Sequence, residues 1–253
     1  MKKKLTAWLL ASVGLATVGS AEVLLDYQFN DANGTEFQNA SYSGVGLTAN
    51  FDNDGKDEWI TTNGALRVVQ TPHRASHTWG LNNTVTSGVI TIDVAVTGYD
   101  LSGITVQDDF RNAVEDQNPD KSRSGEIGFR HSTNSTVAVR SYGSGINAQS
   151  ADMATSGSSV YMRTILDLDV QEASAYYSFD GLAWTAITEN NSMDLTGSVY
   201  RVRMLYDTDD MAASDYLDVD YLTVTHTIPE PATLGLLAVM GGGALFIRRR
   251  FMI

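Results

Sequence analysis

The chain has 253 residues, of which 17 are lysine or arginine and 30 are aspartate or glutamate, and it contains no cysteine. The missing thiol excludes disulfide scaffolds, zinc sites with thiolate ligands and cysteine nucleophiles. The net charge of −13 argues against nucleic acid as a partner, because an acidic surface repels the phosphate groups.

Residues 1–21 have the three parts of a secretory signal peptide: lysines at the start, an apolar segment at 5–18, and small residues up to Ala21. The apolar segment is shorter than the roughly 20 residues that a membrane-spanning helix needs, which disfavours an uncleaved anchor. We therefore predict export through a cleaved signal peptide and a folded body over residues 22–227.

The segment 50–58 resembles the start of a calcium-binding loop. Asp52, Asp54 and Asp57 supply carboxylate oxygens, the hard ligands that calcium prefers. The twelfth position of this loop is Thr61, where an EF-hand needs a glutamate, so the loop is not an EF-hand. An irregular calcium site formed by these three aspartates is one interpretation, and an ordinary turn rich in Asp and Asn is the other.

The polar segment 73–83 holds two further candidate sites. His73 and His77 have a spacing that suits zinc only on a helix, and the neighbouring residues favour a loop. A loop would expose Trp79, whose ring could stack against a sugar or cap one end of the fold. We therefore predict Trp79 as the exposed aromatic of a carbohydrate site, and Trp184 as part of the core.

Alternating apolar and polar residues recur along residues 22–227, with Gly, Asn, Asp and Ser clusters between them. This pattern predicts about ten to twelve strands, with the first and last paired, and no helix. We predict a single all-β domain, a two-sheet antiparallel β-sandwich of the jelly-roll type. The clearest predicted strands are 23–29, 66–69, 89–96, 136–140, 161–170, 175–179, 200–206 and 217–225.

The segment 167–172 is the one string that resembles an enzyme motif. It is similar to the ExDxxE motif of laminarinase-type retaining glucanases, which are jelly rolls. Such enzymes need two carboxyl groups about 5 to 5.5 Å apart. Asp167 stands where that family has glutamate, and its side chain is one methylene shorter. We therefore predict a polar strand end that faces solvent, and no catalytic residue.

The segment 178–184, with the sequence SFDGLAW, places an Asp-Gly turn between two strand-like runs. Together with the segment 26–31 it resembles the concanavalin A-like, laminin G-like jelly rolls, in which an SxDGxxW hairpin is frequent. The resemblance implies the sandwich fold. It does not specify a ligand, because that superfamily includes lectins, adhesion modules and glucanases.

Six aspartates lie close together near the end of the body, and a cation would reduce their mutual repulsion. Asp218 and Asp220 alternate with apolar residues, which is also the pattern of a strand with one solvated face. Calcium and a solvated face therefore both remain open here. The six residues are Asp207, Asp209, Asp210, Asp215, Asp218 and Asp220.

Residues 228–253 have the pattern of a membrane tail. The 16 uncharged residues 232–247 would form about 24 Å of helix at about 1.5 Å per residue, enough for a thin bilayer. We predict a separate C-terminal transmembrane helix. A basic cluster after it would stop transfer and keep the C-terminus in the cytoplasm: Arg248, Arg249 and Arg250.

A rigid motif, Pro229, Glu230 and Pro231, precedes this helix, and its prolines hold an extended backbone that a protease could grip. Motif, helix and arginine cluster in this order resemble the PEP-CTERM sorting domain of exported proteins of Gram-negative bacteria. The resemblance implies that exosortase, a membrane protease-transpeptidase, reads the motif and removes the tail. It also implies a route from the inner membrane to the cell surface or the extracellular polysaccharide matrix.

Without the leader and the tail, the body keeps 11 basic and 29 acidic residues, a net charge of −18. We predict a non-catalytic cell-surface or matrix protein whose sandwich binds glycans or mediates adhesion, with calcium as the one candidate cofactor. A glycan-active hydrolase or lyase on the same sandwich is the first alternative. A purely structural coat subunit is the second.

Overall fold

The computed structural model describes residues 20–37, 40–44, 47–50, 59–71, 75–104, 109–116, 124–132, 136–143, 146–193, 198–206, 208 and 210–228. Within these ranges the regular elements are sixteen β-strands, so the predicted all-β class is confirmed. The count exceeds the prediction because several strands are too short to show alternation. Residues Ala21–Thr227 form one compact unit.

The two ends of the chain lie outside the described residues, apart from Ser20, Ala21 and Ile228. The signal peptide, the motif Pro229 to Pro231 and the arginines Arg248 to Arg250 therefore stay predictions. Among the residues that the structure does describe, we find no helix with the length and apolar character that a membrane crossing requires.

The larger of two sheets has nine strands, and its registered pairs are antiparallel. β1 pairs with β16, which confirms that the first and last strands are neighbours. Across the sheet the strands are β14 (Thr185–Ser192), β13 (Glu172–Ser178), β12 (Val160–Asp167), β6 (Val89–Asp100), β16 (Tyr216–Ile228), β4 (Ala65–Val69) and β3 (Ile60–Thr62), with β1 (Ser20–Tyr27) beside β16 and β11 (Ser156–Gly157) beside β6.

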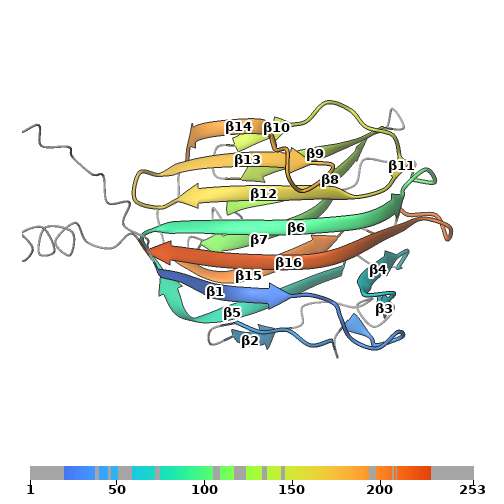
Figure 1. Ribbon diagram of the computed structural model, residues 1–253, viewed down its shortest axis with the longest axis horizontal. Helices are drawn as coiled ribbons and strands as arrows, with labels where there is room; N and C mark the ends of the chain where they lie inside the picture. The colour runs from blue at the N-terminus through green and yellow to red at the C-terminus, as the bar shows by residue number, and fades with distance from the viewer. Residues whose placement is uncertain are drawn as a thin grey trace, which may run out of the picture. The chain divides into compact units, whose positions relative to one another are not determined.

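The smaller sheet has seven strands and lies behind the larger one in Figure 1, so the body is a two-sheet antiparallel sandwich of the predicted jelly-roll type. Its strands are β10 (Ile146–Gln149), β9 (Thr136–Gly143), β8 (Ser124–Ser132), β7 (Asp109–Asp116), β15 (Val199–Tyr206), β5 (Ala75–Val85) and β2 (Leu47–Asn50).

Side-chain alternation places the core between the sheets. Every second residue of β12 is buried, because successive side chains of a strand point to opposite faces. Aromatic rings fill the core near β1, where the Tyr27 hydroxyl donates a hydrogen bond of 2.9 Å to the Phe37 carbonyl. Burial, and after it the nearby Asp31 carboxylate, raises the pKa of Tyr27 well above its usual value.

Candidate functional site

Trp79 lies in β5 and its side chain is fully buried, 0% exposed, so the prediction of an exposed ring in a loop was wrong. The ring lies edge-on to Tyr27 with the ring centroids 5.7 Å apart, and it lies 4.1 Å from the His77 ring. In the register of β5 with β15, Trp79 is opposite Val202, a core residue. β5 (Ala75–Val85) includes most of the segment that we predicted as a polar loop, and the rings of His77 and Trp79 occupy its inward positions.

For Trp184 the difference between prediction and structure is the reverse. It directly precedes β14 and is only half-buried, so the prediction that it belongs to the core was wrong. The Arg163 guanidinium lies 4.4 Å from the centroid of the indole ring, and Arg163 also bonds the Asp93 carboxylate at 2.6 Å. Trp184 therefore covers an ion pair on the sheet surface.

The predicted Asp-Gly turn joins β13 to β14. The Asp180 carboxylate accepts hydrogen bonds of 2.8 Å from the N–H groups of Leu182 and Ala183, and one of 2.9 Å from the Ser178 hydroxyl. These bonds lower the pKa of Asp180, the Ala183 N–H most of all. Gly181 has a φ of +73°, a conformation that glycine adopts without strain. The hairpin therefore supports the fold.

The enzyme-like string 167–172 forms the turn between β12 and β13. The Asp167 carboxylate accepts hydrogen bonds from the N–H groups of Asp169 at 3.0 Å and Val170 at 3.2 Å. The Asp169 carboxylate accepts one of 3.0 Å from the Gly88 N–H. Both carboxylates therefore hold the turn. The predicted strand end is present, but the strand ends at Asp167 and not after Val170 as predicted.

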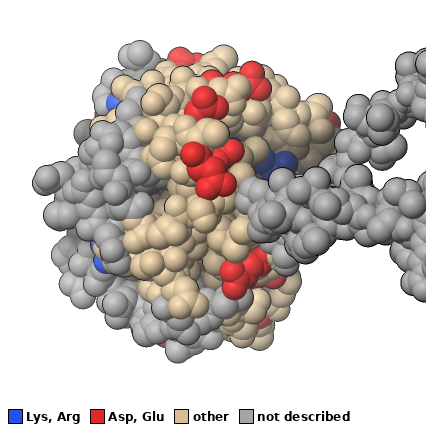
Figure 2. Space-filling model, turned by 90° about the vertical axis from the view of Figure 1, so that its left-hand side faces the viewer, with Lys and Arg blue, Asp and Glu red and all other residues tan. Residues whose placement is uncertain are grey.

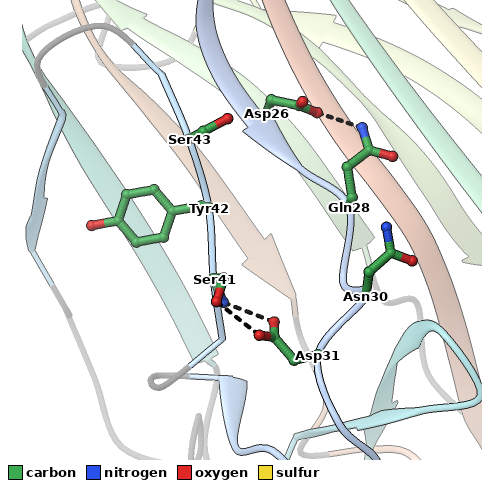
Figure 3. Close-up of a pocket in the computed structure, with 7 residues that line it drawn as sticks. All are labelled: Asp26, Gln28, Asn30, Asp31, Ser41, Tyr42 and Ser43. Atoms are coloured by element: carbon green, nitrogen blue, oxygen red, sulfur yellow. Dashed lines mark hydrogen bonds between the residues drawn. The ribbon is translucent and has the colours of Figure 1, made fainter.

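A groove with a volume of about 340 Å³, lined by residues of polar types, opens beside β1 (Figure 3). Along this part of the chain Leu25, Tyr27 and Phe29 are buried, so the residues between them face outward. The opposite wall is the segment 41–43, which is tied to β1 by two main-chain hydrogen bonds of 2.6 and 2.9 Å. The groove is lined by Asp26, Gln28, Asn30, Asp31, Ser41, Tyr42 and Ser43.

Hydrogen bonds orient the acidic side chains of the groove. The Asp31 carboxylate accepts two bonds of 2.8 Å from Ser41, one from its main-chain N–H and one from its hydroxyl. The Gln28 amide donates to the Asp26 carboxylate, which also accepts a bond of 3.2 Å from the Thr223 hydroxyl of β16. The carboxylates are thus held in place before any ligand arrives.

Tyr42 connects the groove to the core. Its ring points away from Gln28 and Asp31 in Figure 3, and it lies edge-on to the rings of Tyr27 and Trp79, with centroid distances of 5.8 and 6.2 Å. The polar residues of the groove therefore lie over a packed aromatic base.

The groove was not predicted from the sequence, although the sequence contains a pattern for one of its walls. Polar residues 26, 28 and 30 alternate with apolar residues 25, 27 and 29, which indicates one polar face. In the sequence, segment 26–31 indicates only the fold. The serines of the opposite wall carry no such signal, because only the folded chain brings them to β1.

Two aspartates of the acidic stretch near the end of the body, Asp215 and Asp218, have partners within the fold. The buried Asp215 carboxylate accepts hydrogen bonds from the N–H groups of Gly103 at 3.0 Å and Ala212 at 2.9 Å. Asp218 pairs with Arg67 through two bonds of 2.8 and 2.7 Å. Within the described ranges no three His, Asp or Glu side chains lie close enough to hold a metal ion. The loop with Asp52, Asp54 and Asp57 lies outside those ranges, as do Asp207 and Asp209.

No protein-family model and no curated protein matches this chain significantly. Solved structures share its fold. The CBM2 module of the evolved Dit of Lactobacillus casei BL23 phage J-1 has a TM-score of 0.54 at 7% identity, over 83% of this chain and 97% of that one. SCLam, a non-specific endo-beta-1,3(4)-glucanase of family GH16, has a TM-score of 0.52 at 10% identity, over 85% and 98%.

A bifunctional GH43-CE protein of Bacteroides eggerthii has a TM-score of 0.51 at 17% identity. The match covers 79% of this chain and 27% of that protein, so this chain spans about a quarter of its length. At such identities the likeness shows a shared jelly-roll sandwich and nothing finer.

Proposed function

We propose that this chain is an exported, non-catalytic cell-surface or matrix protein whose sandwich binds a glycan in the groove beside β1. The observation that carries the proposal is the lining of that groove, in which two carboxylates, two amides and two hydroxyls converge on one open surface. Sugars present neighbouring hydroxyl groups, and these pair with carboxylate and amide groups.

The acidic side chains of the groove are already ordered, which lowers the entropy cost of binding a sugar. Asp31 and Asp26 are already held by Ser41, Gln28 and Thr223, so a sugar that bonds their remaining lone pairs would pay little to order them. Asn30 shares no hydrogen bond with the other groove residues drawn in Figure 3, and its amide is the adaptable contact.

The ends of the chain support the cellular part of the proposal. The signal peptide would deliver the chain to the export machinery, and the C-terminal helix would hold it in the inner membrane. Exosortase would then read Pro229, Glu230 and Pro231 and release the body to the surface or to the extracellular polysaccharide. A hydrolase has less support, because the enzyme-like string at Asp167 forms a turn.

Glycan binding can be tested with the full chain in detergent on a panel of immobilised natural polysaccharides. We expect retention by at least one, and about a tenfold loss of affinity in Asn30→Ala and Asp31→Asn, since each removes a polar contact of the kind that contributes about 1–3 kcal/mol. Asp31→Asn keeps the size of the side chain. The control is Asp152→Ala, an exposed aspartate outside the groove. Retention by no polysaccharide would instead favour a structural coat subunit.

Calcium at the loop of Asp52, Asp54 and Asp57 is a separate part of the proposal. An ion that binds only the folded chain should add about 2.7 kcal/mol of stability at about 100 times its dissociation constant. The measurement is the melting temperature with calcium, against magnesium at equal ionic strength. We expect a rise with calcium alone that is lost in Asp52→Ala and in Asp54→Ala. Equal rises with both ions would mean charge screening and an ordinary turn.

A further inference from the structure

Aromatic side chains lie on the outward face of the nine-stranded sheet, the side that Figure 1 presents to the viewer. Along β12 every second residue is buried, so Tyr161 and Arg163 face away from the smaller sheet. Arg163 lies opposite Tyr176 in the register with β13 and contacts the Trp184 ring, which places both rings on the same side. We call this surface the aromatic face, and its four partly exposed rings are Tyr161, Tyr176, Trp184 and Tyr221.

A small residue separates two of these rings. Ala95 of β6 lies opposite Tyr161 on one side and opposite Tyr221 on the other, so the two tyrosines stand two strands apart, roughly 10 Å. Burial raises the pKa of Tyr221, and so do the Asp93 carboxylate and Tyr161, because these side chains lie close to it. A methyl group, and no larger side chain, therefore lies between the two rings.

A row of polar side chains joins the aromatic face to the groove beside β1. Asp93 of β6 lies between Arg163 of β12 and Thr223 of β16 in the register, and its carboxylate bonds Arg163 at 2.6 Å. The Thr223 hydroxyl donates a hydrogen bond of 3.2 Å to Asp26 of β1, one of the residues that line the groove. The row therefore crosses β12, β6, β16 and β1, a distance of roughly 14 Å at about 4.8 Å between neighbouring strands.

Contacts within the fold orient two of the rings before any ligand binds. The Arg163 guanidinium, which is bonded to Asp93, lies 4.4 Å from the centroid of the Trp184 ring. The Tyr176 hydroxyl donates a hydrogen bond of 3.2 Å to the Glu189 carboxylate of β14. A ligand that stacks on these rings would therefore lose little free energy in ordering them.

The arginines of this sheet are paired with carboxylates. Its strands contain two arginines and no lysine. Arg163 is bonded to Asp93, and Arg67 is bonded to Asp218 at 2.7 Å. At the end of the sandwich that Figure 2 shows, acidic side chains are exposed on the described surface. An acidic polysaccharide would therefore be repelled, whereas a neutral glycan has no charge that needs a partner.

We infer that the aromatic face extends the groove beside β1 into a binding surface for a neutral polysaccharide chain. The apolar C–H faces of its sugar rings would stack on Tyr161, Trp184 and Tyr221, and the hydroxyl groups at the ring edges would bond the polar row. A row of roughly 14 Å is longer than one sugar ring and suits a chain of sugars. The inference rests on the proposed function, and it adds the class of ligand and a second part of the site.

The test compares cellohexaose, a neutral chain of six β-linked glucose rings, with cellobiose, which has two. In calorimetric titrations of the full chain in detergent, we expect cellohexaose to bind at least about tenfold more tightly. Trp184→Ala and Tyr221→Ala should each weaken cellohexaose binding about tenfold, as the loss of a stacking ring would. Tyr221→Phe keeps the ring and should retain most of the affinity. The matched control is Tyr142→Ala, an exposed tyrosine of β9 in the smaller sheet, which should bind as the unchanged chain does.

Four results would overturn the inference: no binding of cellohexaose, equal affinity for cellohexaose and cellobiose, unchanged binding in both Trp184→Ala and Tyr221→Ala, or tighter binding of the acidic polygalacturonate. Asn30→Ala separates the two parts of the site. If Asn30→Ala weakens cellohexaose binding and the two aromatic variants do not, the groove proposal stands and the aromatic face is wrong. If the aromatic variants weaken it and Asn30→Ala does not, the aromatic face binds the chain and the groove proposal is wrong.

Discussion

Replacing Trp79 by alanine is expected to lower the free energy of unfolding by about 3–5 kcal/mol, as is typical for a fully buried large aromatic residue. The ring is 0% exposed and packs against Tyr27, Phe37 and Tyr42. Its removal would leave a cavity that rigid strands on either side cannot close. Chemical denaturation followed by far-UV circular dichroism measures the change.

Trp184→Ala is the matched control, because it removes the same side chain from the surface. That ring is half-buried and its main contact is the Arg163 guanidinium, a cation–π interaction that contributes about 0.5–1 kcal/mol at an exposed site. We expect a loss of about 1 kcal/mol or less. A stable Trp79→Ala that has lost glycan binding would restore the interpretation of Trp79 as a sugar platform.

Replacing Pro229, Glu230 and Pro231 together by alanine is expected to abolish processing of the tail. Alanines would no longer impose the extended backbone that we expect from the prolines, and the predicted apolar helix would then extend into the motif. The chain should then stay full-length in the inner membrane, which immunoblotting of membrane and medium fractions would show.

A second tail variant controls for changes in membrane insertion. Lysines in place of Arg248, Arg249 and Arg250 keep the positive charge that sets orientation, so this variant should be processed as the unchanged chain is. If the alanine variant is cleaved and released at the same rate, the sorting interpretation of the motif is wrong.

Local patterns in the sequence were enough to predict the class of the fold and the positions of many strands. Alternation is a local pattern, because it depends only on neighbouring residues. It can therefore be recognised without knowing which strands pair. The Asp180 turn was predictable for the same reason, because a turn is built by residues within a few positions of each other. The export and sorting signals at the ends are also linear patterns, and they remain predictions.

Which face of a strand is buried depends on contacts between distant parts of the chain. Trp79 shares its face of the sheet with Val202 of β15, a core residue, whereas the half-buried Trp184 directly precedes β14, the edge strand of its sheet. The groove likewise depends on a distant contact, the bond from Thr223 to Asp26. Alternation gives two faces without saying which one meets the second sheet, and that choice is made by residues more than a hundred positions away.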